Sequence, residues 1–128
     1  MDELTVTKLE PVFQDDRGGS FGLKTRKMPE FMLVFRKADT VSGGHYHRGR
    51  IPEKNPEVFF LFEGRAELSW KAADGMKTTL VEAPCRIEIR PDVWHQMRAI
   101  TDIAFLEEGW LSRDAFEKDT VRCRAGRG

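Results

Sequence analysis

Short apolar runs separated by turn residues are the main pattern along this chain. One nearly continuous apolar run, residues 57–62, reads EVFFLF and is followed closely by Gly64. Residues 65–70 and 86–90 instead alternate between apolar and polar side chains. Because successive side chains of a strand point to opposite faces, this alternation predicts strands that bury one face.

No long segment shows the 3.6-residue period of a helix, and Asp74-Gly75 is a strong hairpin signal. One helical turn is predicted near residues 113–118, with Ser112 or Asp114 as its N-cap. The pattern therefore predicts an all-β sandwich or barrel with a short C-terminal helical turn. Its other predicted strands cover residues 21–25, 31–37, 77–81, 95–99 and 103–107.

The length of 128 residues fits one domain, and we expect residues 1–128 to form it. Apolar residues make up 40% of the chain, including nine Phe and three Trp, which suffices for one compact core. Lys plus Arg and Asp plus Glu number 21 each, so the formal net charge is zero. We therefore expect neither nucleic acid nor an anionic membrane as a partner.

The ends of the chain and its cysteines indicate an intracellular protein. The start, MDELTVTKLE, lacks the apolar segment of a signal peptide, and no stretch approaches the roughly 20 apolar residues of a membrane span. Two cysteines make no disulfide framework, and Cys85 is expected to be a buried free thiol. We expect a cytoplasmic location and a flexible basic tail over residues 122–128.

All three histidines of the chain, together with one glutamate, form a candidate metal site. His45 and His47 are two residues apart, so a strand directs both to the same face. Glu57 opens the apolar run and needs a partner there, and His95 restarts a strand after the Pro91-Asp92 turn. Three imidazoles and a carboxylate suit Zn, Fe, Mn, Ni or Co and leave room for water or substrate.

These residues resemble the two cupin motifs. The segment 44–64, with His-x-His, Glu57 and then Gly64, resembles the first motif, and the turn before His95, within residues 86–99, resembles the second. The resemblance implies a jelly-roll β-barrel of the cupin superfamily, similar to the RmlC-like cupins, with His45, His47, Glu57 and His95 as metal ligands.

Three departures from the cupin pattern stand out. Nine residues, 48–56, separate His47 from Glu57 where the family has three or four, so residues 48–56 are predicted to be an inserted loop. Glu53 is a rival for the glutamate position, although its spacing to Gly64 does not fit. Asp92 replaces the usual Gly, and Ala99 the frequent Asn.

The N-terminal segment 13–21, FQDDRGGSF, resembles the start of the sugar-nucleotide epimerase and ketoisomerase cupins. That resemblance implies proton transfer next to a sugar ketone, with His45, His47 and His95 as catalytic candidates. The tyrosine acid of the epimerases is not matched, since Tyr46 is the only tyrosine and points away from its neighbours. Four basic residues are candidates for contact with a diphosphate: Arg17, Lys24, Arg26 and Arg36.

Two other functional classes remain open. A metal-dependent dioxygenase or lyase would act on a small organic molecule in an apolar pocket, and a non-enzymatic cupin would only bind a ligand. Exposed edge strands also favour a homodimer. Candidate residues for the apolar pocket are Phe35, Phe59, Leu61, Met97 and Phe105.

Overall fold

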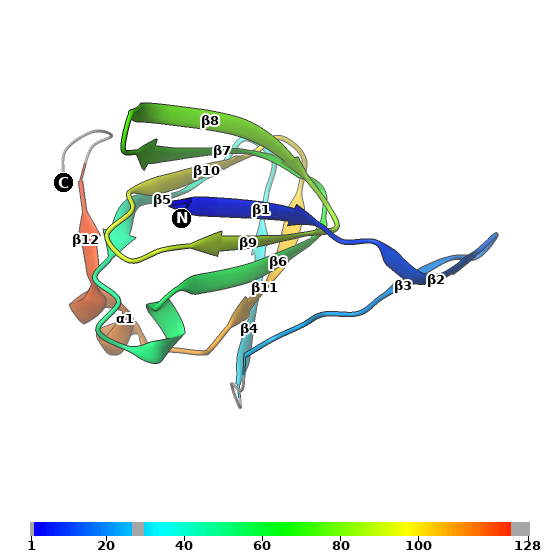
Figure 1. The fold of residues 1–128 in the computed structure, drawn as a ribbon, viewed down its shortest axis with the longest axis horizontal. Helices are drawn as coiled ribbons and strands as arrows, with labels where there is room; N and C mark the ends of the chain where they lie inside the picture. Colours follow the sequence, from blue (N-terminus) through cyan, green and yellow to red (C-terminus); the bar gives the residue numbers. More distant parts are fainter. Residues whose placement is uncertain (1, 27–29, 124–128) are drawn as a thin grey trace.

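Two five-stranded antiparallel sheets face each other and enclose the core (Figure 1). The computed structural model describes residues 2–26 and 30–123. In order across the first sheet lie β1 (Leu4–Lys8), β9 (Cys85–Ile89), β6 (Glu57–Glu63), β11 (Ile103–Glu108) and β4 (Phe31–Arg36). In order across the second lie β12 (Thr120–Arg122), β5 (Val41–His47), β10 (His95–Ala99), β7 (Arg65–Ala72) and β8 (Gly75–Glu82).

The sequence alternation corresponds to the inward and outward faces of these strands. In β9, Cys85, Ile87 and Ile89 are buried, while Arg86 and Glu88 between them are half-buried. The buried residues of both sheets meet in one apolar core, as the period of two requires. The predicted all-β jelly roll is therefore confirmed.

The short C-terminal helix is also present, as α1 (Arg113–Asp119). The hydroxyl of Ser112 accepts a hydrogen bond from the Ala115 backbone N–H, so Ser112 is the N-cap. A 3-10 turn, η1 (Pro52–Lys54), lies within the predicted inserted loop. No helix in residues 2–26 and 30–123 has the length and apolar character needed to cross a membrane.

The N-terminal strands differ from the prediction. Strands β2 (Pro11–Asp15) and β3 (Gly18–Phe21) form a separate two-stranded hairpin, so the strand predicted at residues 21–25 is wrong. The chain turns back at Asp16 and Arg17, and residues 22–26 then have no neighbouring strand to pair with. Strand β1 escaped prediction because Leu4 is its only buried residue.

The first residue of the predicted flexible tail, residues 122–128, belongs to a strand. Arg122 belongs to β12, which pairs with β5, and its guanidinium forms an ion pair with Glu117. The indole N–H of Trp94 donates a hydrogen bond to the Cys123 carbonyl and holds the chain there. The rest of the predicted tail, residues 124–128, lies outside the described residues.

Candidate metal and substrate site

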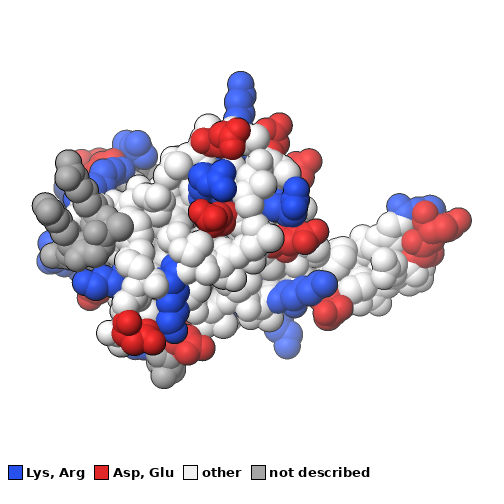
Figure 2. Space-filling view, turned by 90° about the horizontal axis from the view of Figure 1, so that it is seen from above, with Lys and Arg blue, Asp and Glu red and all other residues white. Residues whose placement is uncertain are grey.

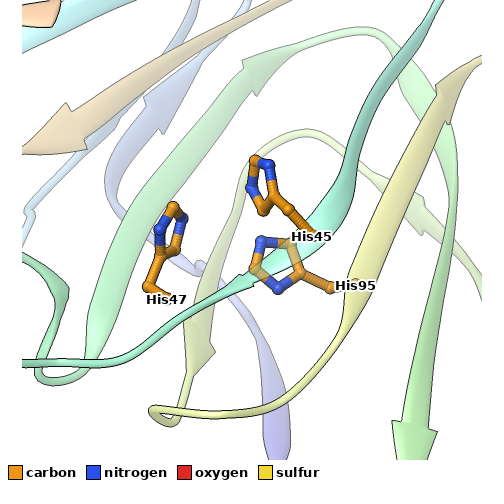
Figure 3. A group of neighbouring side chains, drawn as sticks. All are labelled: His45, His47 and His95. Atoms are coloured by element: carbon orange, nitrogen blue, oxygen red, sulfur yellow. The ribbon is translucent and has the colours of Figure 1, made fainter. Parts of the chain in front are cut away.

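The three histidines converge on one point between the sheets (Figure 3). His45 and His47 stand two residues apart on β5, and His95 on β10 is the direct cross-strand partner of His45. One ring nitrogen from each of the three lies within 4.8 Å of the other two. The cluster forms because side chains two residues apart on β5 share a face, and because β5 pairs with β10.

Glu57 approaches the same point from the first sheet, where it begins β6. Its Oε1 lies 3.4 Å from Nε2 of His47 and 3.2 Å from Nε2 of His95. Glu57, His47 and His95 are all buried. The rival Glu53 instead has its side chain against Gly109. The structure thus brings together all four residues of the predicted ligand set.

The hydrogen bonds at Nδ1 of His47 and His95 determine whether Nε2 of each ring faces Glu57 with a lone pair. Nδ1 of His95 lies 2.9 Å from the Val93 carbonyl, which can only accept, so Nδ1 carries the hydrogen. The Thr120 hydroxyl donates to the Phe116 carbonyl, so it accepts from Nδ1 of His47 at 3.1 Å. When either ring is neutral, its Nε2 therefore carries no hydrogen.

Lone pairs on two imidazoles and one carboxylate oxygen consequently point at one another. Nε2 of His47 and Oε1 of Glu57 are buried and have no hydrogen-bond donor among the described residues. Such an arrangement is repulsive unless a cation or an additional proton lies between the groups. Imidazole nitrogens with a carboxylate oxygen are a donor set that fits a first-row divalent ion.

A buried lysine, which sequence analysis missed, completes the site. Nζ of Lys54 lies 3.0 Å from Oε2 of Glu57 and 3.4 Å from Oε2 of Glu107, and all three residues are buried. The spacing of Ile103, Phe105 and Glu107 along β11 was a usable signal, because period two places Glu107 on the inner face with them. No comparable pattern pointed to Lys54, which lies in the inserted loop.

Other contacts hold the inserted loop against the barrel. Arg26 donates to the Pro52 carbonyl and also to the buried Glu108 carboxylate, at 2.6 Å. The Asp119 carboxylate accepts hydrogen bonds from the backbone N–H groups of Gly49 and Arg50. The loop is therefore anchored ahead of η1 and at the first residue of η1, and it delivers Lys54 to the site.

Burial and neighbouring charges set the protonation of these groups. Burial, reinforced by His95 and His47, lowers the pKa of His45 to about 3, so this ring is neutral near pH 7. Burial alone would raise the pKa of Glu57, but the Lys54 ammonium and the two imidazoles hold it well below the usual range. Burial and the charge of Glu57 raise the pKa of Glu107 well above its usual range.

A cavity of about 390 Å³ opens beside the cluster. His45, His95, Glu57 and Lys54 lie on its wall, whereas His47 is behind them. The cavity wall thus combines the polar cluster with an apolar inner lining and further polar residues such as Arg36 and Glu107. Its apolar lining includes Phe59, Leu68, Met97 and Phe105, and other lining residues are Arg36, Trp110 and Arg113.

The four residues predicted to contact a diphosphate do not lie together in the structure. Arg36 lines the cavity, where its Nε donates to the Ser42 hydroxyl. Arg17 lies at the turn of the β2–β3 hairpin and pairs with Asp15, Lys24 is exposed, and Arg26 binds Glu108. Within a single chain, none of these last three lines the cavity.

The residues predicted to line an apolar pocket also lie in different places. Phe59, Met97 and Phe105 line the cavity. Leu61 is part of the buried core, and Phe35 points outward from β4 and is 64% exposed. The apolar residues of the cavity wall come from the inner faces of both sheets and from the segment that includes Trp110 and α1.

No protein-family model matches the chain, and no curated protein matches it in sequence. Solved structures do match its fold. A sugar 3,4-ketoisomerase from Thermoanaerobacterium thermosaccharolyticum in complex with TDP has a TM-score of 0.71 at 18% identity, over 94% of this chain and 88% of that one. A 3,4-ketoisomerase from Helicobacter canadensis has a TM-score of 0.72 at 16% identity, over 96% and 92%.

A third match is the dTDP-4-dehydrorhamnose 3,5-epimerase from Sulfolobus tokodaii, with a TM-score of 0.65 at 15% identity, over 92% of this chain and 75% of that one. At such identities the likeness establishes the fold alone. The RmlC-like cupin fold predicted from the two motifs is thereby confirmed.

Proposed function

We propose that this chain is a metal-binding cupin enzyme that moves a proton next to a carbonyl group, as an isomerase or epimerase of nucleotide-linked sugars. The observation that carries the proposal is the convergence of Nε2 of His47 and His95 on Oε1 of Glu57, at the wall of an open cavity. Buried lone pairs in this arrangement favour a bound cation, and the cavity gives a substrate access to it.

His45, His47, His95 and Glu57 would hold the ion, which is Zn, Fe, Mn, Ni or Co by its ligand types. When bound, such an ion polarises a carbonyl oxygen and thereby acidifies the adjacent carbon. The protein's own contribution is to fix the four donors, since Nδ1 of His47 and of His95 are each held by a hydrogen bond.

Two further groups on the cavity wall suit the proton transfer. The Lys54 ammonium can stabilise negative charge that develops on a carbonyl oxygen. Glu107 lies beside Lys54, and burial favours its protonated form, so it can return a proton to an enolate. Should the reaction run without metal, His95 is the better base on the wall, since a pKa of about 3 makes His45 a weak one.

Other residues lining the cavity support a nucleotide-linked substrate. Arg36 and Arg113 both line the cavity, and a guanidinium is a bidentate partner for phosphate. Trp110, also part of the lining, is exposed and offers a flat surface to a planar base. The likeness to structures that were solved with TDP supports the same substrate class.

Solvent isotope exchange tests the proposal directly. The metal-loaded protein would be incubated in D₂O with TDP-4-keto-6-deoxyglucose, the sugar nucleotide bound in one of the matching ketoisomerase structures. We expect deuterium next to the ketone by mass spectrometry, and none with a His95→Asn variant. Glu63→Gln, at the exposed end of the same strand as Glu57, is the control. Absence of exchange with nucleotide-linked 4-keto sugars would contradict the proposal.

A second candidate is a metal-dependent dioxygenase or lyase acting on a small organic molecule. The apolar inner lining, with Phe59, Leu68, Met97 and Phe105, favours it because a sugar offers little apolar surface to such a wall. Oxygen-dependent turnover by the iron-loaded protein would support the dioxygenase. Tight binding of a metabolite with no turnover would support a non-enzymatic cupin.

A further inference from the structure

Phe116 meets the histidine cluster from the short helix α1, which lies at one end of the barrel beside β12 (Figure 1). The centroid of its ring lies 5.9 Å from that of His45 and 5.4 Å from that of His47, in edge-to-face contacts. The same ring lines the cavity. One aromatic side chain outside the ligand set thus contacts two of the predicted metal ligands.

His47 is separated from the cavity by its neighbours. His45, His95 and Phe116 line the cavity, whereas His47 does not line it and is only 3% exposed. The two rings beside His47 are those of Phe116 and of His45, the latter 4.6 Å away between centroids. Because both of these neighbours face the cavity, they cover His47 on that side. Truncation of Phe116 would therefore extend the cavity to His47.

Hydrogen bonds fix the backbone that carries this ring. The Phe116 backbone N–H donates to the Ser112 carbonyl at 3.0 Å, and the Phe116 carbonyl accepts from the Thr120 hydroxyl at 2.6 Å. That hydroxyl is also the group that accepts from Nδ1 of His47. The helical turn that presents the ring therefore also orients the imidazole beneath it.

Three basic groups gather at the ring of Phe116. Nζ of Lys54 and the guanidinium carbons of Arg113 and Arg122 lie over it, 5.4 to 5.7 Å from its centroid. On the face of the molecule seen in Figure 2, by contrast, the described basic and acidic side chains are interspersed. Because a cation is attracted to the face of an aromatic ring, these three groups stabilise the ring in this orientation.

We propose that Phe116 is a positioning residue of this site, whose ring closes the α1 side of the histidine cluster so that water, ions and substrate reach the cluster only from the cavity. An apolar shell around a metal site controls the access of solvent to it. The effect of the ring on a bound ion rests on the proposed metal site, whereas its covering of His47 does not. Loss of the ring should expose His47 and admit additional water to a bound ion.

Acylation of histidine by diethyl pyrocarbonate tests the covering in the metal-free full chain. The reagent attacks through an imidazole nitrogen that carries no hydrogen, and fragmentation of the labelled peptide by mass spectrometry separates His47 from His45. We expect His47 to be labelled about tenfold faster in Phe116→Ala than in the unmodified protein. Phe116→Leu should be labelled as slowly as the unmodified protein, because leucine retains most of the apolar bulk.

Ala115→Gly is the matched control on the same helix. It weakens α1 but leaves the ring of Phe116 in place, so His47 should remain protected. Circular dichroism would verify that every variant keeps its fold. Slow labelling of His47 in Phe116→Ala would overturn the proposal. Labelling that is equally fast in Ala115→Gly would also overturn it, since the helix and not the ring would then provide the cover.

Cobalt substitution tests the effect on a bound ion. The visible absorption of Co²⁺ weakens as its coordination number rises, so Phe116→Ala should absorb less than the unmodified protein. A chelator should also remove cobalt from this variant about tenfold faster. Phe116→Leu should retain the unmodified spectrum. Failure of the unmodified chain to take up cobalt would contradict the proposed metal site, whereas identical spectra and release rates in Phe116→Ala would overturn only the role of Phe116.

Discussion

Nε2 of His95 lies 3.2 Å from Oε1 of Glu57, although the two residues stand on strands of opposite sheets. The Val93 carbonyl binds the hydrogen on Nδ1 of His95, so a neutral His95 ring and the ionised Glu57 carboxylate have no hydrogen to share. The contact therefore joins the two halves of the barrel only when a cation or a second proton occupies the space between them.

Substitution of a buried ligand should abolish metal binding. We expect His47→Ala and Glu57→Gln to lose the ion that the unmodified chain retains, because each removes one donor from the set. Metal content after dialysis, measured by mass spectrometry, checks this, with Glu63→Gln as the control for loss of a glutamate on the same strand. An unchanged metal content in His47→Ala would count against the site.

Glu107 should make stability depend on pH. Its pKa is raised in the folded state, so as pH rises above about 4.5 the unfolded chain releases this proton first. The folded state then loses stability until pH passes the raised pKa. Glu107→Gln cannot ionise, so its stability relative to the unmodified protein should increase over that range.

Urea unfolding at a series of pH values, in chelator, measures this difference. The control is Glu63→Gln, which should follow the unmodified protein at every pH. A constant difference between Glu107→Gln and the unmodified protein would mean that Glu107 does not titrate as a buried acid.

Arg26 should be important for stability rather than for substrate binding. Its removal in Arg26→Met leaves the fully buried Glu108 carboxylate without its ion-pair partner and frees the Pro52 carbonyl. We expect a loss of about 3 kcal/mol in the free energy of unfolding, the lower end for a broken buried pair. Arg17→Met should change it little, because the Arg17 side chain is 81% exposed.

Cys85 should resist thiol reagents in the folded protein. It is buried, and burial raises the pKa of its thiol to about 11, so almost no thiolate forms near pH 8. Titration with a chromogenic disulfide should label Cys85 only after denaturation, with mass spectrometry identifying the labelled residue. Rapid labelling of Cys85 in the native protein would show that the core around β9 opens readily.

Much of the fold was predictable from local pattern. Alternating stretches became β7 and β9, and Asp74-Gly75 lies at the turn between β7 and β8. Gly64 has φ of +89°, and a side chain there would collide with the Asp102 carbonyl, which accounts for the glycine of the first motif. These features depend on backbone conformation and side-chain alternation, and short stretches of sequence specify both.

Other features have no local signature. The prediction missed Lys54 because an isolated lysine in a polar loop looks solvated, and only the packing of that loop buries it between Glu57 and Glu107. The same limit applies to Arg17, which sequence placed near a substrate and the structure places at the turn of the β2–β3 hairpin. The surroundings of both Lys54 and Arg17 depend on how segments far apart in the chain are placed relative to one another.

By itself, the sequence determined the strand periodicity and the types of side chain at the site. His45 and His47 share a face because side chains in a strand repeat every two residues. Only the tertiary structure decided that Glu57 faces them from the opposite sheet, that Lys54 neutralises it, and that β2 and β3 form a hairpin separate from both sheets. The physical reason is that alternation specifies which way a side chain points, whereas sheet pairing and packing determine what it meets.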